Sequence, residues 1–379
     1  MLARRSRAGG TRTRAACGHR SGDRQPPHLP PRRDEAHPHP RHRPSAARRG
    51  LVFLRLRCSM RTLYIDRRDA SLDSESGALT VRVAGERPAS FPLSLVERVV
   101  VHGNANLSGR LLGELWKRDC GLLVLSGRRL DPTARFLGRP RRDIATRLAQ
   151  YELVRDPDRR LAFARRIVRA KLETERRLLD RLARRTGRDG PRQRDALSRI
   201  EEGLEQLAGA ADLAGLTGIE GAAAAAYFRA FTGFFAPALE FTGRNRRPPR
   251  DPVNVCLSLG YTLLQFEASR QVQMHGLDPM LGALHAPAAG RESLACDLVE
   301  PLRTHVDRLA FELFADGVLR KGHFHRAGEA CMLGKEGRRR YYEAWERRAP
   351  AIARLLGRIC GDLVRELRGT VPAAIEVEP

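Results

Sequence analysis

The sequence predicts an α+β protein with two domains, a small β-rich N-terminal domain followed by a larger all-α domain. In residues 60–138, apolar side chains alternate with polar ones in short runs, which is the period of a half-buried strand. In residues 139–369 they recur three, four and seven positions apart, which is the period of an amphipathic helix. A chain of 379 residues with 42% hydrophobic residues is long enough to bury two cores.

Residues 1–59 differ in composition from the rest of the chain. They hold 15 of the 69 Arg and Lys residues, three acidic residues and seven prolines, with too few apolar groups for a core. We expect this extension, like the tail at 370–379, to lack regular structure. It could be an organelle transit peptide, a DNA-binding tail or an over-long start. The sequence favours an over-long start with the true one at Met60, because an ordered pattern begins directly after it.

Charge and cysteine content limit the class of protein. The net charge is +25, and the chain after residue 59 still holds 54 basic against 41 acidic residues. This excess indicates a polyanionic partner such as nucleic acid, although solvated faces account for part of it. The seven cysteines form no Cys-x-x-Cys pair, which argues against a zinc module and a disulfide framework and favours a reducing cytoplasm. No apolar run approaches the roughly 18 residues that a membrane span needs, so we expect a soluble protein.

Short strands and one helix are expected in the N-terminal domain. The strands are predicted at residues 63–65, 79–83, 93–95, 99–101 and 121–126, separated by glycine turns. Ser108 is the expected N-cap of a helix that ends near Asp119. This domain carries no catalytic constellation.

Two helices of the second domain carry candidate residues. A stripe of apolar residues from Leu161 to Leu182 predicts a helix whose arginine-rich faces are either solvated or in contact with phosphates. Thr217 and Glu220 have the spacing of a capping box at the start of a further helix. The alanines at 222–226 would let a helix or ligand approach closely, just after the Glu220 carboxylate.

A cationic loop follows at residues 244–252. It contains Arg244, Arg246, Arg247 and Arg250 together with three prolines. Because proline restricts the backbone, the guanidinium groups would be held in place at a low entropy cost, which suits phosphate binding. An exposed linker would have the same composition. We favour phosphate contact.

The segment from Gly276 to Glu300 is the strongest candidate for chemistry. A Gly/Asp/Pro turn leads to His285, and a helix with Ser293 as its expected N-cap carries Asp297 and Glu300 on adjacent sides of one turn. A histidine and two carboxylates could hold a divalent metal. The helical wheel places Glu300 opposite the apolar stripe, however, which is typical of a surface residue.

Two further features follow this segment in the sequence. Pro301 removes a backbone hydrogen bond and should bend the helix beside Glu300. His323 and His325 could form a metal-ligating pair, although such a pair is more often a surface feature.

Four motifs in order resemble the CRISPR-associated spacer-acquisition integrases, the first-numbered family of CRISPR-associated proteins. They are Ile-Glu-Gly at 219–221, Arg-Pro-Pro at 247–249 with its following helix, Gly-Leu-Asp-Pro at 276–279 leading to His285, and Asp-Leu-Val-Glu-Pro-Leu-Arg at 297–303. The resemblance covers Met60 to about Leu367. Cys296 stands where this family usually has an apolar residue, which a cysteine can replace as a small hydrophobic group.

The resemblance implies a β-rich N-terminal dimerisation domain and an all-α catalytic domain. It implies that Glu220, His285 and Glu300 are the catalytic metal ligands, with Asp297 as a supporting carboxylate. Two hard oxygen ligands and one imidazole suit Mg²⁺ or Mn²⁺. The expected partners are a second copy of the chain and a small ferredoxin-like protein, the second-numbered CRISPR-associated protein.

The activity implied by the resemblance is integration of DNA. The 3′-hydroxyl of a spacer precursor would attack the phosphodiester at the border of a CRISPR repeat, both being double-stranded DNA, in the cytoplasm of a prokaryote. Two alternatives stay open. The chain could be a repair nuclease that acts on branched DNA through the same site, or a DNA-binding scaffold whose acidic cluster is structural.

Overall fold

The computed structural model describes most of the chain after residue 60. The described residues are 51–52, 62–67, 69–126, 130–141, 143–245 and 248–369. The tail at 370–379 and nearly all of the predicted extension lie outside them. At Leu51–Val52 the structure differs from the expected lack of regular structure, since these residues form strand β1.

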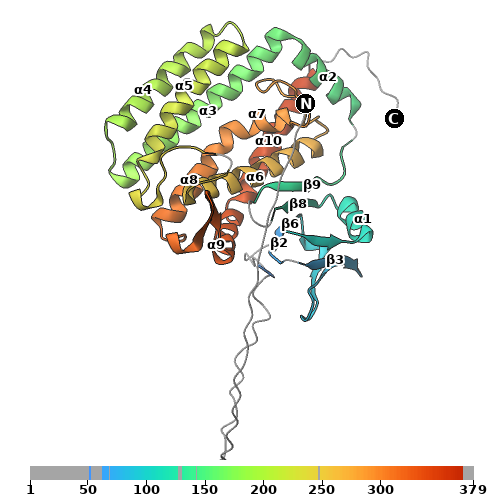
Figure 1. Ribbon diagram of the computed structural model, residues 1–379. Coiled ribbons are helices and arrows are strands. Elements are labelled where there is room, and N and C mark those ends of the chain that lie inside the picture. The colour runs from blue at the N-terminus through green and yellow to red at the C-terminus, as the bar shows by residue number, and fades with distance from the viewer. Residues whose placement is uncertain are drawn as a thin grey trace, which may run out of the picture. The chain divides into compact units, whose positions relative to one another are not determined.

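The N-terminal region is built from two sheets (Figure 1). In the first, the strand order is β1-β2-β6-β8-β9, with β2, β6 and β8 parallel and antiparallel strands at both edges. In the second, the order is β5-β4-β3-β7. The bounds are Thr62–Ile65 for β2, Ala70–Glu75 for β3, Ala78–Arg82 for β4, Ala89–Pro92 for β5, Arg98–His102 for β6, Ala105–Leu107 for β7, Gly121–Leu125 for β8 and Pro132–Phe136 for β9.

The predicted strands at 63–65, 79–83, 99–101 and 121–126 and the predicted helix are present as β2, β4, β6, β8 and α1. Every residue of β2 and β6 is buried, as expected for strands covered on both faces. Ser108 caps helix α1 (Gly109–Lys117), because its side chain accepts a hydrogen bond from the Leu111 N–H. The strand expected at 93–95 is wrong, since Leu93–Leu95 forms a 3₁₀ turn. Strands β3, β5, β7 and β9 were not predicted.

The second region is mostly helical. Its long α3 (Pro157–Thr186) begins at the Asp156 N-cap and ends at Gly187 in the left-handed conformation. α3 packs beside α4 (Pro191–Gln206) and α5 (Leu213–Thr232) in one layer (Figure 1). The remaining helices are α2 (Ile144–Arg155), α6 (Pro252–Met274), α7 (Ser293–Val299), α8 (Arg303–Ala315), α9 (Lys335–Glu346) and α10 (Ala349–Gly369).

The prediction of an all-α second domain is wrong in one place. Strands β10 (Phe324–Ala327) and β11 (Ala330–Leu333) form an antiparallel hairpin inside the helical region. His325 is exposed on this hairpin, and neither it nor His323 lines the cavity described below. The fold is therefore an N-terminal β-sheet region followed by a mostly helical region. The boundary expected at 138/139 falls between β9 and α2 and stays a prediction.

Buried polar contacts join the first sheet to the helices. Arg98 on β6 donates to Glu267 on α6 at 2.8 Å. Tyr64 on β2 donates to Glu346 on α9 at 2.7 Å. Strand β8 also packs closely against α6. A Cβ added at Gly121 on β8 would lie 2.8 Å from the ring of Phe266 on α6.

Among the described residues, we find no helix long and apolar enough to cross a membrane. This agrees with the absence of a long apolar run in the sequence.

Candidate active site

A cavity of about 490 Å³ in the helical region is lined by the three side chains that the sequence predicts as metal ligands. Glu220 comes from α5, His285 from the loop between α6 and α7, and Glu300 from the turn after α7. The structure thus brings together side chains that are far apart in the sequence. The cavity is also lined by Lys171, Arg244, Tyr261 and Arg303.

Glu220 lies in the interior of its helix. Helix α5 begins at Leu213 and is capped by Asp212, whose side chain accepts from the Gly215 N–H at 2.8 Å. The Thr217 hydroxyl donates to the Leu213 carbonyl at 2.7 Å, as expected one turn into a helix. The capping-box interpretation of Thr217 and Glu220 is therefore wrong, and the Glu220 carboxylate faces the cavity instead.

Glu300 is buried, which contradicts the surface position given by the helical wheel. Its exposed fraction is 6%, because helix α3 contacts the turn that carries it and covers the side that the wheel assigned to solvent. α7 ends at Val299, a 3₁₀ turn covers Glu300–Leu302, and α8 starts at Arg303. The 3₁₀ turn interrupts the α-helix at Pro301, and the bend expected there stays a prediction. The Thr174 hydroxyl donates to the Pro301 carbonyl at 3.0 Å.

Asp297 fixes the position of His285. This fully buried carboxylate accepts from the His285 ring Nδ1 at 2.7 Å. It also accepts from the backbone N–H groups of Ala283, Leu284 and His285 at 2.6, 3.1 and 2.9 Å. Because Nδ1 donates to Asp297, Nε2 carries the free lone pair and is the atom able to bind a metal.

The loop that carries His285 packs tightly onto α7. A Cβ added at Gly282 would lie 2.5 Å from the backbone carbon of Ser293, so this position needs glycine. The predicted N-cap at Ser293 is wrong. α7 begins at Ser293 itself, and the preceding residue, Glu292, makes no side-chain capping bond.

Two cations that the sequence analysis did not single out contact the carboxylates. The Lys171 ammonium on α3 donates to Glu300 at 2.6 Å and also bonds Glu220. Arg303 donates to the other oxygen of Glu300 at 2.9 Å and lies over the Tyr261 ring. Lys171 interrupts the apolar stripe of α3 next to Leu172, which is the signal that could have identified it.

The charges determine the ionisation of this cluster. Burial opposes ionisation of Glu300, but Arg303 and Lys171 outweigh it and lower its pKa to about 2. Burial likewise disfavours the Lys171 ammonium, but Glu300, Glu175 and Glu220 raise its pKa above the ordinary value. The ammonium and the Glu300 carboxylate are therefore both charged at neutral pH.

A second buried polar layer lies behind the cavity. Asp307 on α8 accepts from the hydroxyls of Tyr227, at 2.8 Å, and Tyr261. Burial raises the pKa of Asp307 to about 6. Burial also raises the pKa of Glu175, one turn after Lys171 on α3, to about 8.

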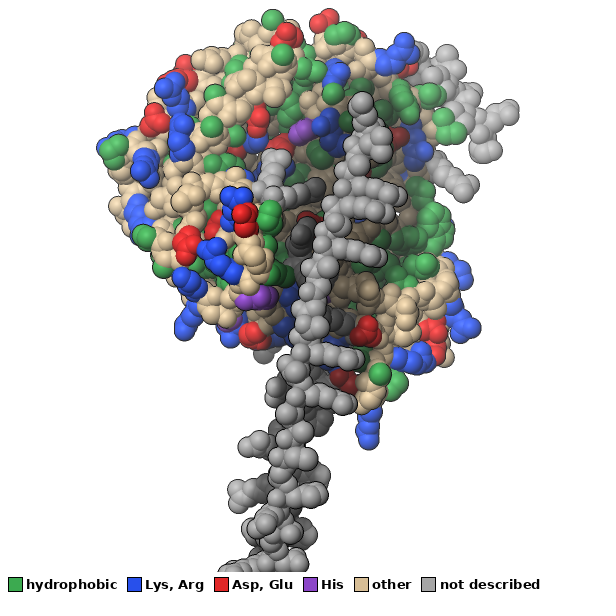
Figure 2. Space-filling model, viewed as in Figure 1, with side chains coloured by type: hydrophobic (Ala, Val, Ile, Leu, Met, Phe, Trp, Pro, Cys, Tyr) green, Lys and Arg blue, Asp and Glu red, His purple; other side chains and the backbone are tan. Residues whose placement is uncertain are grey.

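The predicted DNA-binding arginines are only partly described. Arg246 and Arg247 lie outside the described residues. Arg244 donates to Asn254 and Ser258 at 2.8 and 3.1 Å and lines the cavity, whereas Arg250 is exposed and donates to Glu329 at 3.1 Å. Figure 2 shows basic side chains spread over the visible face and interspersed with acidic ones.

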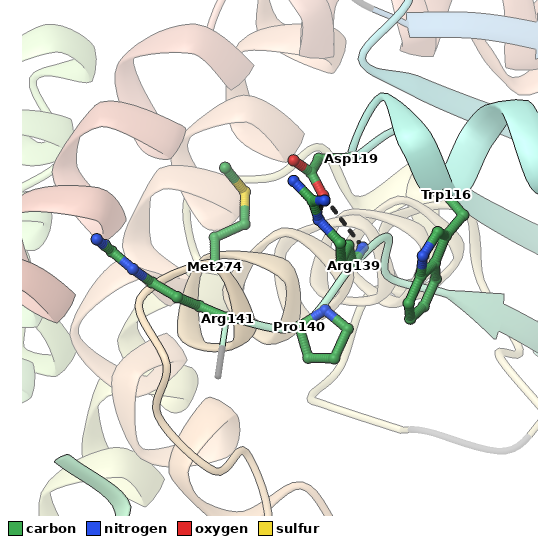
Figure 3. A pocket seen from close by; sticks show the side chains of 6 residues that line it. All are labelled: Trp116, Asp119, Arg139, Pro140, Arg141 and Met274. Atoms are coloured by element: carbon green, nitrogen blue, oxygen red, sulfur yellow. Dashed lines mark hydrogen bonds and ion pairs between the residues drawn. The ribbon is translucent and has the colours of Figure 1, made fainter. Parts of the chain in front are cut away.

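Another cavity, of about 620 Å³, lies where the chain leaves the sheets (Figure 3). Trp116, Pro140 and Met274 supply its apolar lining. Among the described lining residues, the one acidic side chain is Asp119, which accepts from the backbone N–H of Arg139 at 3.2 Å. The first cavity offers two carboxylates and an imidazole, whereas this one offers a single carboxylate that already accepts a hydrogen bond. This cavity is therefore the weaker candidate for metal binding.

The donor types around the first cavity fit Mg²⁺ or Mn²⁺. Two carboxylates and an imidazole nitrogen are suitable ligands for either ion. Within the described residues, no three His, Cys, Asp or Glu side chains already form a group able to hold a metal. A positive charge nevertheless lies between Glu220 and Glu300, since the Lys171 ammonium contacts both. The carboxylates thus already bind a cation.

Comparison with known proteins decides the family. The profile described as "CRISPR associated protein Cas1" matches residues 63–347. This chain belongs to the Cas1 family. The CRISPR-associated endonuclease Cas1 1 of Thermodesulfovibrio yellowstonii is 34% identical over 292 residues, which are 76% of this chain and 91% of the relative.

Solved structures agree with the Cas1 fold. The Cas1 protein TM1797 of Thermotoga maritima gives a TM-score of 0.72 at 23% identity, covering 84% of this chain and 100% of that one. A casposase bound to integration product gives 0.72 at 21% identity over 84% and 96%. A Cas6-RT-Cas1–Cas2 complex gives 0.70 at 23% identity over 82% and 35%.

Proposed function

We propose that this Cas1-family protein is a metal-dependent DNA integrase and endonuclease of CRISPR adaptation. The observation that carries the proposal is the convergence of Glu220, His285 and Glu300 on one cavity. Membership of the Cas1 family and relatives named as endonucleases support it. The structural similarity to a casposase bound to integration product supports the integration reaction.

Three side chains would hold the metal. Glu220 and Glu300 supply oxygen ligands, and the Nε2 atom of His285 supplies a nitrogen ligand. Asp297 keeps the imidazole in the required tautomer through the 2.7 Å contact with Nδ1. A bound Mg²⁺ or Mn²⁺ would supply Lewis-acid stabilisation of the charge that develops on phosphate and leaving oxygen.

The arginines in the cavity would bind and orient the DNA backbone. Arg244 is held by Asn254 and Ser258, and both it and Arg303 lie over the Tyr261 ring. Two guanidiniums at the cavity would attract the phosphate backbone by their positive charge, without reading the base sequence. Arg246, Arg247 and Arg250 would extend this contact along the loop.

The reaction needs no protein nucleophile. The 3′-hydroxyl of the DNA fragment forms a new bond to the phosphorus at the repeat border, the existing P–O3′ bond breaks, and the repeat strand leaves with a 3′-hydroxyl. Water in place of the fragment hydroxyl gives hydrolysis. The reverse transfer gives disintegration, so one site accounts for all three outcomes.

The proposed partners follow from the resemblance and the comparisons. We expect a homodimer through the N-terminal region, double-stranded DNA as spacer precursor and repeat, and the small ferredoxin-like protein in the prokaryotic cytoplasm. The similarity to a chain of the Cas6-RT-Cas1–Cas2 complex supports the ferredoxin-like partner, because that chain has the fold found here and occurs together with Cas2.

The test is strand transfer with the purified full chain. A labelled 3′-OH fragment, supercoiled repeat DNA, the ferredoxin-like partner and Mg²⁺ or Mn²⁺ should yield fragment joined at the repeat border. Cleavage of branched DNA without joining would identify the alternative repair nuclease. DNA binding without joining or cleavage under either metal would identify the scaffold.

A further inference from the structure

The Lys171 ammonium lies between the two proposed carboxylate ligands and is their counter-ion. Its ammonium contacts Glu220 on α5 and Glu300 after α7, at 2.6 Å for Glu300. The side chains are 9%, 20% and 7% exposed for Lys171, Glu220 and Glu300 respectively. Two carboxylates brought this close in a poorly solvated site repel each other, and the ammonium cancels part of that repulsion.

The same helix offers Lys171 a second partner. Glu175 lies four residues later on α3, so both side chains project from one face of the helix. Glu175 is 4% exposed, and within the described part of the chain its Oε2 atom has no hydrogen-bond partner. A buried carboxyl oxygen left without a donor is uncommon, and an ammonium one turn away can satisfy it by a side-chain rotation.

We propose that Lys171 is the resident cation of this site. It neutralises Glu220 and Glu300 in the metal-free protein, competes with a divalent cation for both carboxylates, and has Glu175 as its alternative partner. This inference rests on the proposed function, since it assumes that Glu220 and Glu300 are metal ligands. On this inference, helix α3 controls metal affinity through Lys171, although it supplies none of the three proposed metal ligands.

The direction of each effect follows from this competition. Removing the ammonium takes away the cation shared by the two carboxylates and leaves Glu300 with Arg303 alone, which should strengthen binding of a divalent cation. Removing the acceptor on Glu175 deprives Lys171 of its alternative partner and should weaken that binding. The two effects depend on each other, because Glu175 acts on the metal only through Lys171.

The experiment measures Mn²⁺ affinity of the full chain from the electron paramagnetic resonance signal of free Mn²⁺. Lys171→Met should bind Mn²⁺ about tenfold or more tightly than the unaltered protein, since one charge-assisted hydrogen bond is worth about that factor. Lys171→Arg, which keeps a cation, should show no such gain. Lys117→Met removes an exposed lysine and is the matched control.

Glu175→Leu is a second variant, which roughly retains the size of the side chain and removes both carboxyl oxygens. It should weaken Mn²⁺ binding by roughly threefold to tenfold, the factor expected for one neutral hydrogen bond. In the Lys171→Met background it should have no effect. Equal weakening in both backgrounds would overturn the role given to Glu175.

Failure of the inference differs from failure of the proposed function. If Glu300→Gln abolishes the Mn²⁺ site while Lys171→Met leaves affinity unchanged or lower, the metal site stands and Lys171 is not its competitor. If Glu300→Gln leaves Mn²⁺ affinity unchanged, the site itself is elsewhere.

Discussion

At the scale of single residues, Asp297 holds the loop and the imidazole that line the candidate site. It accepts three backbone N–H groups of one loop and the Nδ1 atom of His285. The loop and the imidazole are thereby fixed by the same two oxygens. Where such a carboxylate orients a metal-binding histidine, its mutation typically lowers metal affinity or activity by about 10- to 100-fold.

Asp297→Asn tests this role. The amide places an N–H₂ group against backbone donors, so we expect the free energy of unfolding to fall by about 1–3 kcal/mol. Strand transfer should fall further than the loss of folded protein explains, because the imidazole is no longer held. Thermal unfolding and the joining assay measure the two effects. Asp195→Asn, on the exposed face of α4, is the control, and full activity in Asp297→Asn would contradict the assignment.

The residues also show what a sequence can and cannot predict. The motifs predict Glu220, His285 and Glu300 as ligands, but the helical wheel placed Glu300 on the surface because it assumes that the polar side of a helix faces solvent. Helix α3 contacts the turn at Glu300–Leu302 and covers that side. Lys171 carries no motif, and its partners come from two other elements, so only the tertiary structure identifies its role.

At the scale of elements, the long helices were predictable and the short elements were not. A period of three and four residues over α3 is a strong signal, whereas the hairpin β10–β11 has four residues in each strand and gives almost none. The 3₁₀ turn at Leu93–Leu95 has alternating apolar residues and therefore resembles a strand in sequence.

The contact between β6 and α9 gives a pH-dependent prediction. His102 on β6 is buried and contacts the Tyr342 hydroxyl on α9, with Asp66 and Arg338 close by. Burial lowers the pKa of His102 to about 4, with Arg338 opposing protonation and Asp66 favouring it. Between this value and the ordinary pKa of about 6.5, the unfolded chain takes up a proton that the folded chain does not.

Stability should therefore fall as the pH decreases through this window. Through His102, the free energy of unfolding should decrease by up to about 3 kcal/mol between pH 7 and pH 4. The variant His102→Gln should lack this part of the acid sensitivity. Urea unfolding at several pH values measures it. His325→Gln, on the exposed hairpin, controls for the loss of a histidine. An identical pH dependence in His102→Gln and the unaltered protein would show that this residue is not responsible.

At the scale of the whole molecule, the net charge of +25 and the mixed surface favour contact with the DNA backbone over recognition of bases. Arg250→Ala removes one exposed cation of the proposed DNA-binding loop. The slope of log affinity against log salt concentration should decrease by about one. Fluorescence anisotropy with unrelated duplexes measures the slope, and Arg365→Ala on α10 is the control. An unchanged slope would exclude Arg250 from the interface.

The most direct test of the central claim is strand transfer and Mn²⁺ binding by Glu220→Gln, His285→Ala and Glu300→Gln, measured on the same preparations. Each variant should retain DNA binding, lose at least about 100-fold in joining and cleavage, and bind Mn²⁺ more weakly, because each removes a ligand. Any of the three that keeps full joining activity and full Mn²⁺ affinity would contradict the proposed metal site.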